Sequence, residues 1–309
     1  MTPIDPRPGA SPTADSTVLW ASPERKFAFQ NWLTTLEGPQ QLALRTLQPA
    51  SADASFRRYL RIDTANAGVG RIIMDAPPDK ENCRPFVQVA RLMQDAGLNV
   101  PEVLAWDEAQ GFMLLSDLGM NTMMQLIDRE HPEANRALYL QAVDALIVWQ
   151  KASKPGVLPP YDEALLRREL ELFPEWYLTH HRGVQVEGEV RRTLDEAFKL
   201  IVAQNLSAAR VYVHRDFMPR NLMVADDTRD ARPGDSGQQR LGVCEFQGAV
   251  SGPITYDIAS LKPDAIPRRA QDLLRGLPIP QRPAGLPAGG AAGRRQPRRH
   301  TARGGGEGD

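Results

Sequence analysis

The 309-residue sequence contains few cysteines, few lysines and no long hydrophobic run. Its two cysteines, Cys83 and Cys244, are too few and too far apart for a disulfide framework or a four-thiolate zinc site, so we expect a reducing compartment, the cytoplasm. Residues 1–17 contain no apolar segment that could act as a signal peptide, and apolar runs such as 145–149 fall far short of the roughly 20 residues that cross a bilayer. We therefore expect no membrane association.

The net charge of -1 is unevenly distributed along the chain. Residues 262–309 carry ten Lys or Arg against four Asp or Glu, which leaves residues 1–261 with a net charge of -7. An acidic body offers no electrostatic footprint for a phosphate backbone, and a basic tail alone would bind it weakly. The sequence therefore predicts no nucleic-acid partner, and we expect a monomer.

The composition, 42% hydrophobic and 24% charged, is that of an ordinary globular protein, and the length favours two domains or two lobes. Residues 1–20 lack periodicity and predict a disordered leader. Ser22 followed by Pro23 is typical of a helix start, and Gly38 marks the end of that helix.

Short strands separated by small and polar residues follow the first helix, and an antiparallel meander is the simplest interpretation. The expected elements are strands within 44–50, 56–63 and 71–78, a helix over 85–96, and a hairpin over 100–119. These elements predict a small α+β N-lobe over residues 21–118.

Helical periodicity dominates after Gly119. We expect helices near 121–128, 133–152, 162–182 and 187–204, and short strands with intervening loops over 209–250. The fold class is therefore α+β and bilobal, with a small antiparallel-sheet N-lobe and a mainly helical C-lobe over residues 119–261.

Residues 214–221 match the kinase catalytic loop H-R-D-x-x-x-x-N. In phosphoryl transfer the carboxylate accepts the proton of the substrate hydroxyl, and the amide oxygen five residues later holds a metal ion against the nucleotide phosphates. Asp216 and Asn221 fit these roles. The alternative is a surface turn in which both side chains only cap backbone groups.

Residues 245–247, Glu-Phe-Gln, occur where a kinase places its Asp-Phe-Gly metal ligand. Glutamate keeps the charge but moves the carboxylate by about 1 Å or more, which can impair a ligand of Mg²⁺. Further on, Asp257 could bond the catalytic loop from behind, although a helix N-cap is the interpretation favoured for this residue by itself.

Several segments together resemble the aminoglycoside phosphotransferase-like kinase family, and in particular its N-acetylmuramate/N-acetylglucosamine 1-kinase branch. The resemblance covers roughly residues 40–261 and rests on HRDFMPRNLMV, EFQGAVSGPITYDIASL, SADASFRRYLRI, IIMDAPP, LLSDLG and YDEALLRRELELFPEWYL. It implies a bilobal protein-kinase-like fold, ATP and Mg²⁺ as cofactors, and phosphorylation of the anomeric hydroxyl of a small-molecule amino sugar in cell-wall recycling.

The resemblance also implies roles for individual residues. Asp216 would be the catalytic base, and Asn221 and Glu245 would be the metal ligands. The hinge at residues 114–118 would hold adenine, with these expected contacts: Leu115, Asp117 and Leu118. The loop 50–55 would cover the phosphates through two small side chains: Ser51 and Ser55.

The chain departs from the usual kinase pattern in its phosphate-binding lysine. None of its six lysines lies in residues 71–78, where Asp75 occupies the expected place, and the helix that follows carries no Glu. A guanidinium binds phosphate bidentately, so Arg57, Arg58 or Arg61 could supply the missing charge. The alternative, a solvated strand face, is expected for at least two of the three.

Residues 262–309 hold seven Pro, nine Gly and no aromatic residue. Such a segment cannot bury a core, so we expect a disordered or out-of-frame tail that a protease removes first. Other hypotheses stay open: a kinase for an aminoglycoside, choline-like or homoserine-like hydroxyl, or a catalytically impaired nucleotide-binding protein.

Overall fold

The computed structural model describes residues 18–52, 56–224 and 241–261. The leader before residue 18, Ser55 and the tail after Leu261 lie outside the described residues, and the predictions for them remain predictions. No helix in the described ranges combines the length and the apolar content needed to span a membrane.

Helix α1 (Pro23–Glu37) begins where the sequence predicts. Ser22 is its N-cap, and the hydroxyl of Ser22 accepts a hydrogen bond from the backbone N–H of Arg25 at 3.2 Å. Pro23 costs no helical hydrogen bond, because the first N–H groups of a helix have no partner within it. Phe29 and Leu33 are the buried residues of α1, and they pack onto the sheet.

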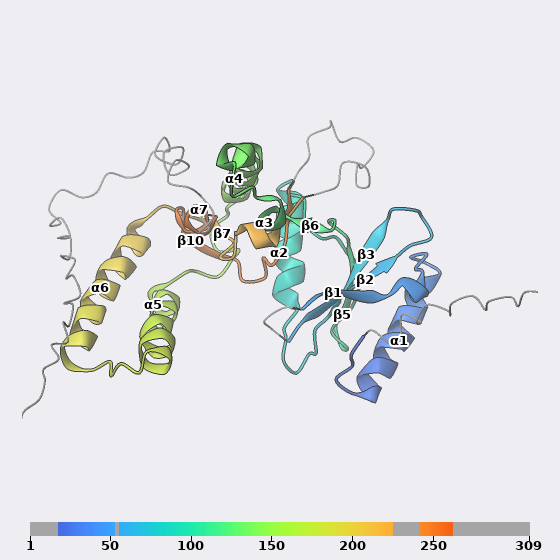
Figure 1. Ribbon diagram of the computed structural model, residues 1–309, viewed down its shortest axis with the longest axis horizontal. Coiled ribbons are helices and arrows are strands. Elements are labelled where there is room, and N and C mark those ends of the chain that lie inside the picture. The colour runs from blue at the N-terminus through green and yellow to red at the C-terminus, as the bar shows by residue number, and fades with distance from the viewer. Residues whose placement is uncertain (1–17, 53–55, 225–240, 262–309) are drawn as a thin grey trace, which may run out of the picture. The chain divides into compact units, whose positions relative to one another are not determined.

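The N-lobe sheet has five antiparallel strands in the order β1-β2-β3-β5-β4 (Figure 1). Their bounds are β1 (Gln48–Ala52), β2 (Arg58–Asp63), β3 (Gly70–Asp75), β4 (Val103–Asp107) and β5 (Phe112–Ser116). The first three form the predicted meander, although residues 44–46 form a 3₁₀ turn, η2 (Leu44–Thr46), instead of a strand.

Helix α2 (Arg84–Asp95) precedes the predicted β4–β5 hairpin, which adds β5 beside β3. The hairpin turns at Gly111, where φ is 69° and a Cβ atom would lie 1.9 Å from the carbonyl oxygen of Ala76. Only glycine fits this close approach.

The two faces of the sheet pack against different partners, because side chains alternate along a strand. We call the first the α1 face, and its buried residues cluster with helix α1: Leu60, Ile62, Ile73, Phe112 and Leu114. We call the second the cleft face, and its residues cluster with α2 and with buried residues of the C-lobe: Tyr59, Ile72, Met74, Met113 and Leu115.

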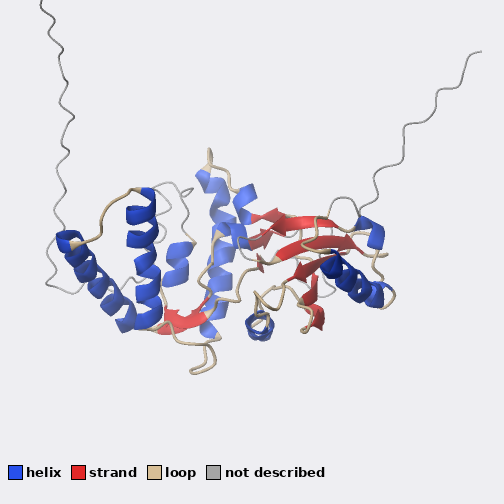
Figure 2. Ribbon diagram, turned by 90° about the horizontal axis from the view of Figure 1, so that it is seen from below, coloured by secondary structure: helices blue, strands red, loops and turns tan. Residues whose placement is uncertain are grey.

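The C-lobe is mainly helical, as predicted, and Figure 2 shows helices in blue making up most of it. Its helical segments are α3 (Met123–Leu126), η3 (Pro132–Asn135), α4 (Arg136–Lys151), α5 (Glu163–Leu172), η4 (Phe173–His181), α6 (Gly188–Ser207), η5 (Pro219–Asn221) and α7 (Tyr256–Ser260). The predicted helix over 162–182 changes from α to π winding at Phe173, where Pro174 cannot donate an intrahelical hydrogen bond.

Two small sheets complete the C-lobe. One pairs β7 (Arg210–Val213) with β10 (Val250–Pro253), and the other has the order β6-β8-β9. The strands of the second are β6 (Asn121–Thr122), β8 (Leu222–Val224) and β9 (Gly242–Val243). The described residues therefore have the α+β class expected, with an antiparallel-sheet N-lobe and a helical C-lobe. The boundary between residues 118 and 119 remains a prediction.

Candidate active site

Two loops, residues 214–221 and 244–249, are tied together by the small sheets of the C-lobe. The first connects β7 to β8, and the second connects β9 to β10. Because β7 pairs with β10 and β8 pairs with β9, both ends of the two loops are joined. The backbone N–H of Cys244 also donates to the carbonyl of Asn221 at 2.9 Å. The fold therefore places the predicted catalytic loop beside the Glu-Phe-Gln segment.

His214 is fully buried and links the two loops. Its Nδ1 lies 3.2 Å from the backbone nitrogen of Asp216, and its Nε2 lies 3.0 Å from the carbonyl oxygen of Cys244. A backbone N–H only donates and a carbonyl only accepts, so the imidazole is neutral and carries its proton on Nε2. Burial lowers the pKa of His214 to about 4, which keeps the ring in this form.

Asp257 supports the catalytic loop from behind. Its buried carboxylate accepts hydrogen bonds from the backbone N–H groups of His214 at 2.7 Å and Arg215 at 3.0 Å. Burial raises the pKa of Asp257 to about 6. Thr255 holds the N-cap position of α7, so the helix-cap interpretation of Asp257 is wrong and the bond to the loop is confirmed.

Arg215 adopts the left-handed backbone region, with φ at 78°. This conformation costs a residue with a side chain about 1–2 kcal/mol. The hydrogen bond to Asp257 fixes the peptide, and the guanidinium forms an ion pair with Glu169 of α5. These two contacts hold the strained turn that leads into Asp216.

Asp216 is exposed, while the backbone around it is fixed. The Asn221 side-chain nitrogen donates to the carbonyl of Asp216 at 2.9 Å, and the N–H of Met218 donates to the same carbonyl at 2.9 Å. Asn221 thus caps a backbone group, as the surface-turn alternative expects. That bond also leaves the Asn221 amide oxygen as the atom that can coordinate a cation.

Glu245 also has a left-handed backbone, with φ at 61°, and its carboxylate contacts the N-lobe. Its Oε1 accepts from the Tyr59 hydroxyl at 3.0 Å, and its Oε2 accepts from Nη2 of Arg57 at 3.3 Å. Burial, and then the charge of Glu245, raise the pKa of Tyr59, so the phenol stays protonated and donates. Tyr59 is absent from the predicted site, although its place two residues from both Arg57 and Arg61 could have indicated it.

Asp75 does not occupy the position expected of a phosphate-binding residue. It lies on the α1 face, where its carboxylate pairs with Arg25 at 2.5 Å and with Arg58 at 2.6 Å. Arg58 is directly opposite Asp75 in the sheet register, so both side chains share that face. The cleft-face residue of β3 beside Asp75 is Met74, which is fully buried. The expectation that Asp75 takes the place of the phosphate-binding lysine is therefore corrected, because Asp75 lies on the α1 face. Arg58 lies on the same face, so its contacts do not support a role as a phosphate ligand.

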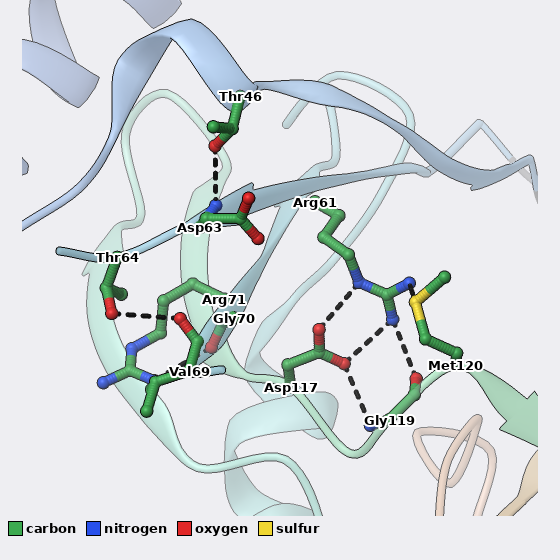
Figure 3. A network of polar contacts seen from close by, with 10 residues as sticks. All are labelled: Thr46, Arg61, Asp63, Thr64, Val69, Gly70, Arg71, Asp117, Gly119 and Met120. Atoms are coloured by element: carbon green, nitrogen blue, oxygen red, sulfur yellow. Dashed lines mark hydrogen bonds and ion pairs between the residues drawn. The ribbon is translucent and has the colours of Figure 1, made fainter. Parts of the chain in front are cut away.

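Arg61 and Asp117 pair with each other (Figure 3). Nε and Nη2 of Arg61 bond the two carboxylate oxygens at 2.7 and 2.9 Å, and Nη2 also donates to the carbonyl of Gly119 at 2.8 Å. A carboxylate oxygen of Asp117 accepts the N–H of Gly119 at 3.0 Å, which closes a tight turn. Arg61 therefore links the 114–118 segment to β2, and its predicted phosphate contact remains a prediction.

The solvated-face interpretation of the three arginines is also wrong. Each guanidinium forms an ion pair with a carboxylate, and the exposed fractions of the side chains are 10% for Arg57, 26% for Arg58 and 14% for Arg61. Each arginine of this short segment therefore has its own acidic partner, in the N-lobe or in the 244–249 loop.

The remaining hinge and loop residues lie in different surroundings. Leu115 is buried on the cleft face, whereas its neighbour Leu114 is buried on the α1 face. Leu118 is buried and packs over Gly242, where an added Cβ atom would lie 2.8 Å from its Cδ1. Ser51 lies within β1, and its proposed phosphate contact remains a prediction.

Asn221 and Glu245 have the donor chemistry that suits magnesium. Mg²⁺ takes oxygen ligands, and in nucleotide sites one or two protein groups complete a shell made by phosphates and water. The amide oxygen of Asn221 and the carboxylate of Glu245 come from loops that the sheets join. These residues fit a magnesium ion that is bound together with a nucleotide.

Comparison with known proteins places the chain among phosphotransferases. Residues 46–281 match the model of the phosphotransferase enzyme family, so the match ends twenty residues beyond Leu261. The ADP-bound aminoglycoside phosphotransferase APH(2'')-Ib has a similar fold, with a TM-score of 0.50 at 11% identity over 74% of this chain and 73% of that chain.

Curated relatives are more similar in sequence. N-acetylmuramate/N-acetylglucosamine kinase of Pseudomonas aeruginosa is 46% identical over 75% of this chain, and its counterpart of Neisseria meningitidis is 38% identical over 85%. The matches cover 64% of the Pseudomonas aeruginosa protein, 60% of the Pseudomonas putida protein and 75% of the Neisseria protein, so the chain spans less than two thirds of the first two. With the family match and these identities, the chain belongs to the phosphotransferase enzyme family.

Proposed function

We propose that this chain is an ATP-dependent kinase that phosphorylates the anomeric hydroxyl of an N-acetylated amino sugar, N-acetylmuramate or N-acetylglucosamine, in cell-wall recycling. The observation that carries the proposal is the 46% identity to a relative named for both sugars, together with a catalytic loop that retains Asp216 and Asn221. The proposal places the protein in the cytoplasm, acting on a small-molecule sugar.

Each site residue has a part in this reaction. The exposed Asp216 accepts the proton of the sugar hydroxyl as the oxygen attacks. Asn221 and Glu245 supply oxygen ligands for the metal ion. Asp257 and His214 hold the catalytic loop in its conformation. Bound ATP with magnesium supplies the transferred phosphoryl group and the charge that stabilises its transfer.

The test is ATP consumption by the purified chain across a panel of N-acetylated sugars and aminoglycosides. We expect turnover with N-acetylmuramate and N-acetylglucosamine. We expect none with their 1-O-methyl glycosides, which keep every other hydroxyl and lose only the anomeric one. Equal turnover with the methyl glycosides would exclude the anomeric position, and turnover with aminoglycosides alone would replace the sugar as acceptor.

Glu245→Asp is expected to raise turnover or to lower the Mg²⁺ concentration for half-maximal activity. The shorter side chain restores the ligand length usual in kinases, and Mg²⁺ tolerates only small departures from octahedral geometry. A Mg²⁺ titration of the initial rate measures the change. Glu108→Asp, at a surface ion pair with Arg84, serves as the matched control. A fall in activity with Glu245→Asp alone would mean that the site has adapted to glutamate.

A further inference from the structure

The nucleotide phosphates need a cation, and Arg57, immediately before β2, lies next to the cleft face of the sheet. Its β3 residues, Ile72 and Met74, are apolar, and Arg61 is bound bidentately to the hinge. Arg57 lies two residues before Tyr59 and contacts the same carboxylate, Glu245. Among the three arginines of this segment, Arg57 is the one that contacts the residue proposed to hold the metal.

Arg57 also has a supporting carboxylate on the N-lobe side. Its Nε lies 3.9 Å from Oε2 of Glu81, and Oε1 of Glu81 accepts the backbone N–H of Phe56 at 3.1 Å. Glu81 therefore contacts both the guanidinium of Arg57 and the backbone of Phe56. Kinases orient their phosphate-binding lysine with a glutamate of the following helix, and Glu81 lies just before α2.

From these contacts we propose that Arg57 binds the nucleotide phosphates in place of the missing lysine, and that it leaves Glu245 when the nucleotide binds. In this exchange the guanidinium turns from a carboxylate to a phosphate, and Glu245 turns from the guanidinium to the metal ion. Each charged group that loses its partner therefore gains another one. Tyr59 and Gln247 remain within hydrogen-bond reach of Glu245 and hold it during the exchange.

The proposal rests on the nucleotide site of the proposed function, and its test measures binding instead of turnover. The chain and its variants are titrated calorimetrically with ADP, in excess EDTA and again with Mg²⁺. A charge-assisted contact to phosphate predicts that Arg57→Gln weakens ADP binding about 10- to 100-fold in both conditions. Arg57→Lys should recover part of the loss.

Arg58→Gln is the matched control, because Arg58 is the adjacent residue and pairs with Asp75 on the other face of the sheet. We expect its ADP affinity to stay within about twofold of the unmodified chain. Equal affinities for Arg57→Gln and Arg58→Gln would overturn the role of Arg57. Failure of the unmodified chain to bind ADP in either condition would instead overturn the kinase function.

Glu245→Gln tests the exchange itself and remains informative if Arg57→Gln does not fold. Removing the carboxylate should tighten ADP binding in EDTA about 3- to 10-fold, because Arg57 then has one competing partner fewer. In the double variant with Arg57→Lys, which lacks the Nη2 atom that contacts Glu245, this gain should shrink to less than about half. An undiminished gain in ADP affinity in the double variant would indicate simple repulsion between Glu245 and the phosphates, and would contradict the exchange. The absence of a gain in Glu245→Gln alone would contradict it as well.

Discussion

Replacing Asp216 by asparagine is expected to lower kcat by about 10²- to 10⁴-fold, the usual contribution of a general base. The amide has the shape of the carboxylate but cannot take the proton of the hydroxyl. We expect the loop to keep its conformation, because the side chains of His214, Asn221 and Asp257 hold its backbone.

Initial rates at saturating sugar and ATP measure this effect, and calorimetric titration with ADP measures nucleotide affinity, which should change less than about twofold. Asp144→Asn, at an exposed position of α4, is the matched control and should change neither quantity. Undiminished turnover of Asp216→Asn would remove the base assignment.

Asp257→Asn is expected to reduce kcat by about 100-fold, although Asp257 touches neither proposed substrate. An amide has one acceptor oxygen, so one of the backbone N–H groups of His214 and Arg215 would face an NH₂ group. The strained turn at Arg215 would relax and displace Asp216. Steady-state kinetics should show the loss in kcat with little change in the KM for ATP. The rate is divided by the folded fraction measured by circular dichroism, because unfolding of the lobe would also lower apparent kcat and leave KM unchanged. A loss of kcat that only follows the folded fraction would contradict the displacement of Asp216.

The same variant should change how stability depends on pH. Between about pH 4 and 6 the folded chain keeps Asp257 protonated while the unfolded chain does not, so this group lowers the free energy of unfolding as pH rises. His214 acts in the opposite direction, since its pKa of about 4 keeps it neutral in the folded chain while the unfolded chain is protonated. In the unmodified chain the two contributions oppose each other.

Asp257→Asn leaves the contribution of His214 unopposed. Relative to the unmodified chain, its free energy of unfolding should rise by about 3 kcal/mol from pH 4 to pH 6, because it no longer carries the carboxyl whose pKa burial raises to about 6. Urea unfolding at four pH values across this range provides the measurement. Parallel curves for the two proteins would show that Asp257 ionises normally in the fold.

The sequence predicts the elements of the fold better than the faces of its strands. Ser22 and Pro23 begin α1 as their chemistry requires, and the catalytic loop is recognisable because its residues are adjacent in the chain. In β3, by contrast, apolar residues occupy both faces, so alternation does not indicate which face Asp75 joins. Helix α1 decides this by bringing Arg25 to Asp75.

Side-chain pairs between residues far apart in the chain also cannot be predicted from the sequence. Arg57 and Glu245 are 188 residues apart, and Arg61 and Asp117 are 56 apart. Local sequence shows only that each residue is charged. For Asp257, a position near a helix start suggests a cap, and only the fold shows that Thr255 takes that place and leaves Asp257 to bond the catalytic loop.

The position of the transferred phosphate tests the account most directly. The purified chain is incubated with ATP, Mg²⁺ and N-acetylmuramate or N-acetylglucosamine, and the product is examined by phosphorus and proton NMR. We expect one phosphate per ADP formed, coupled to the anomeric proton of the sugar, and the same product formed about 10²- to 10⁴-fold more slowly by Asp216→Asn. A phosphate coupled to any other sugar proton, or ADP formed without a sugar phosphate, would contradict the account.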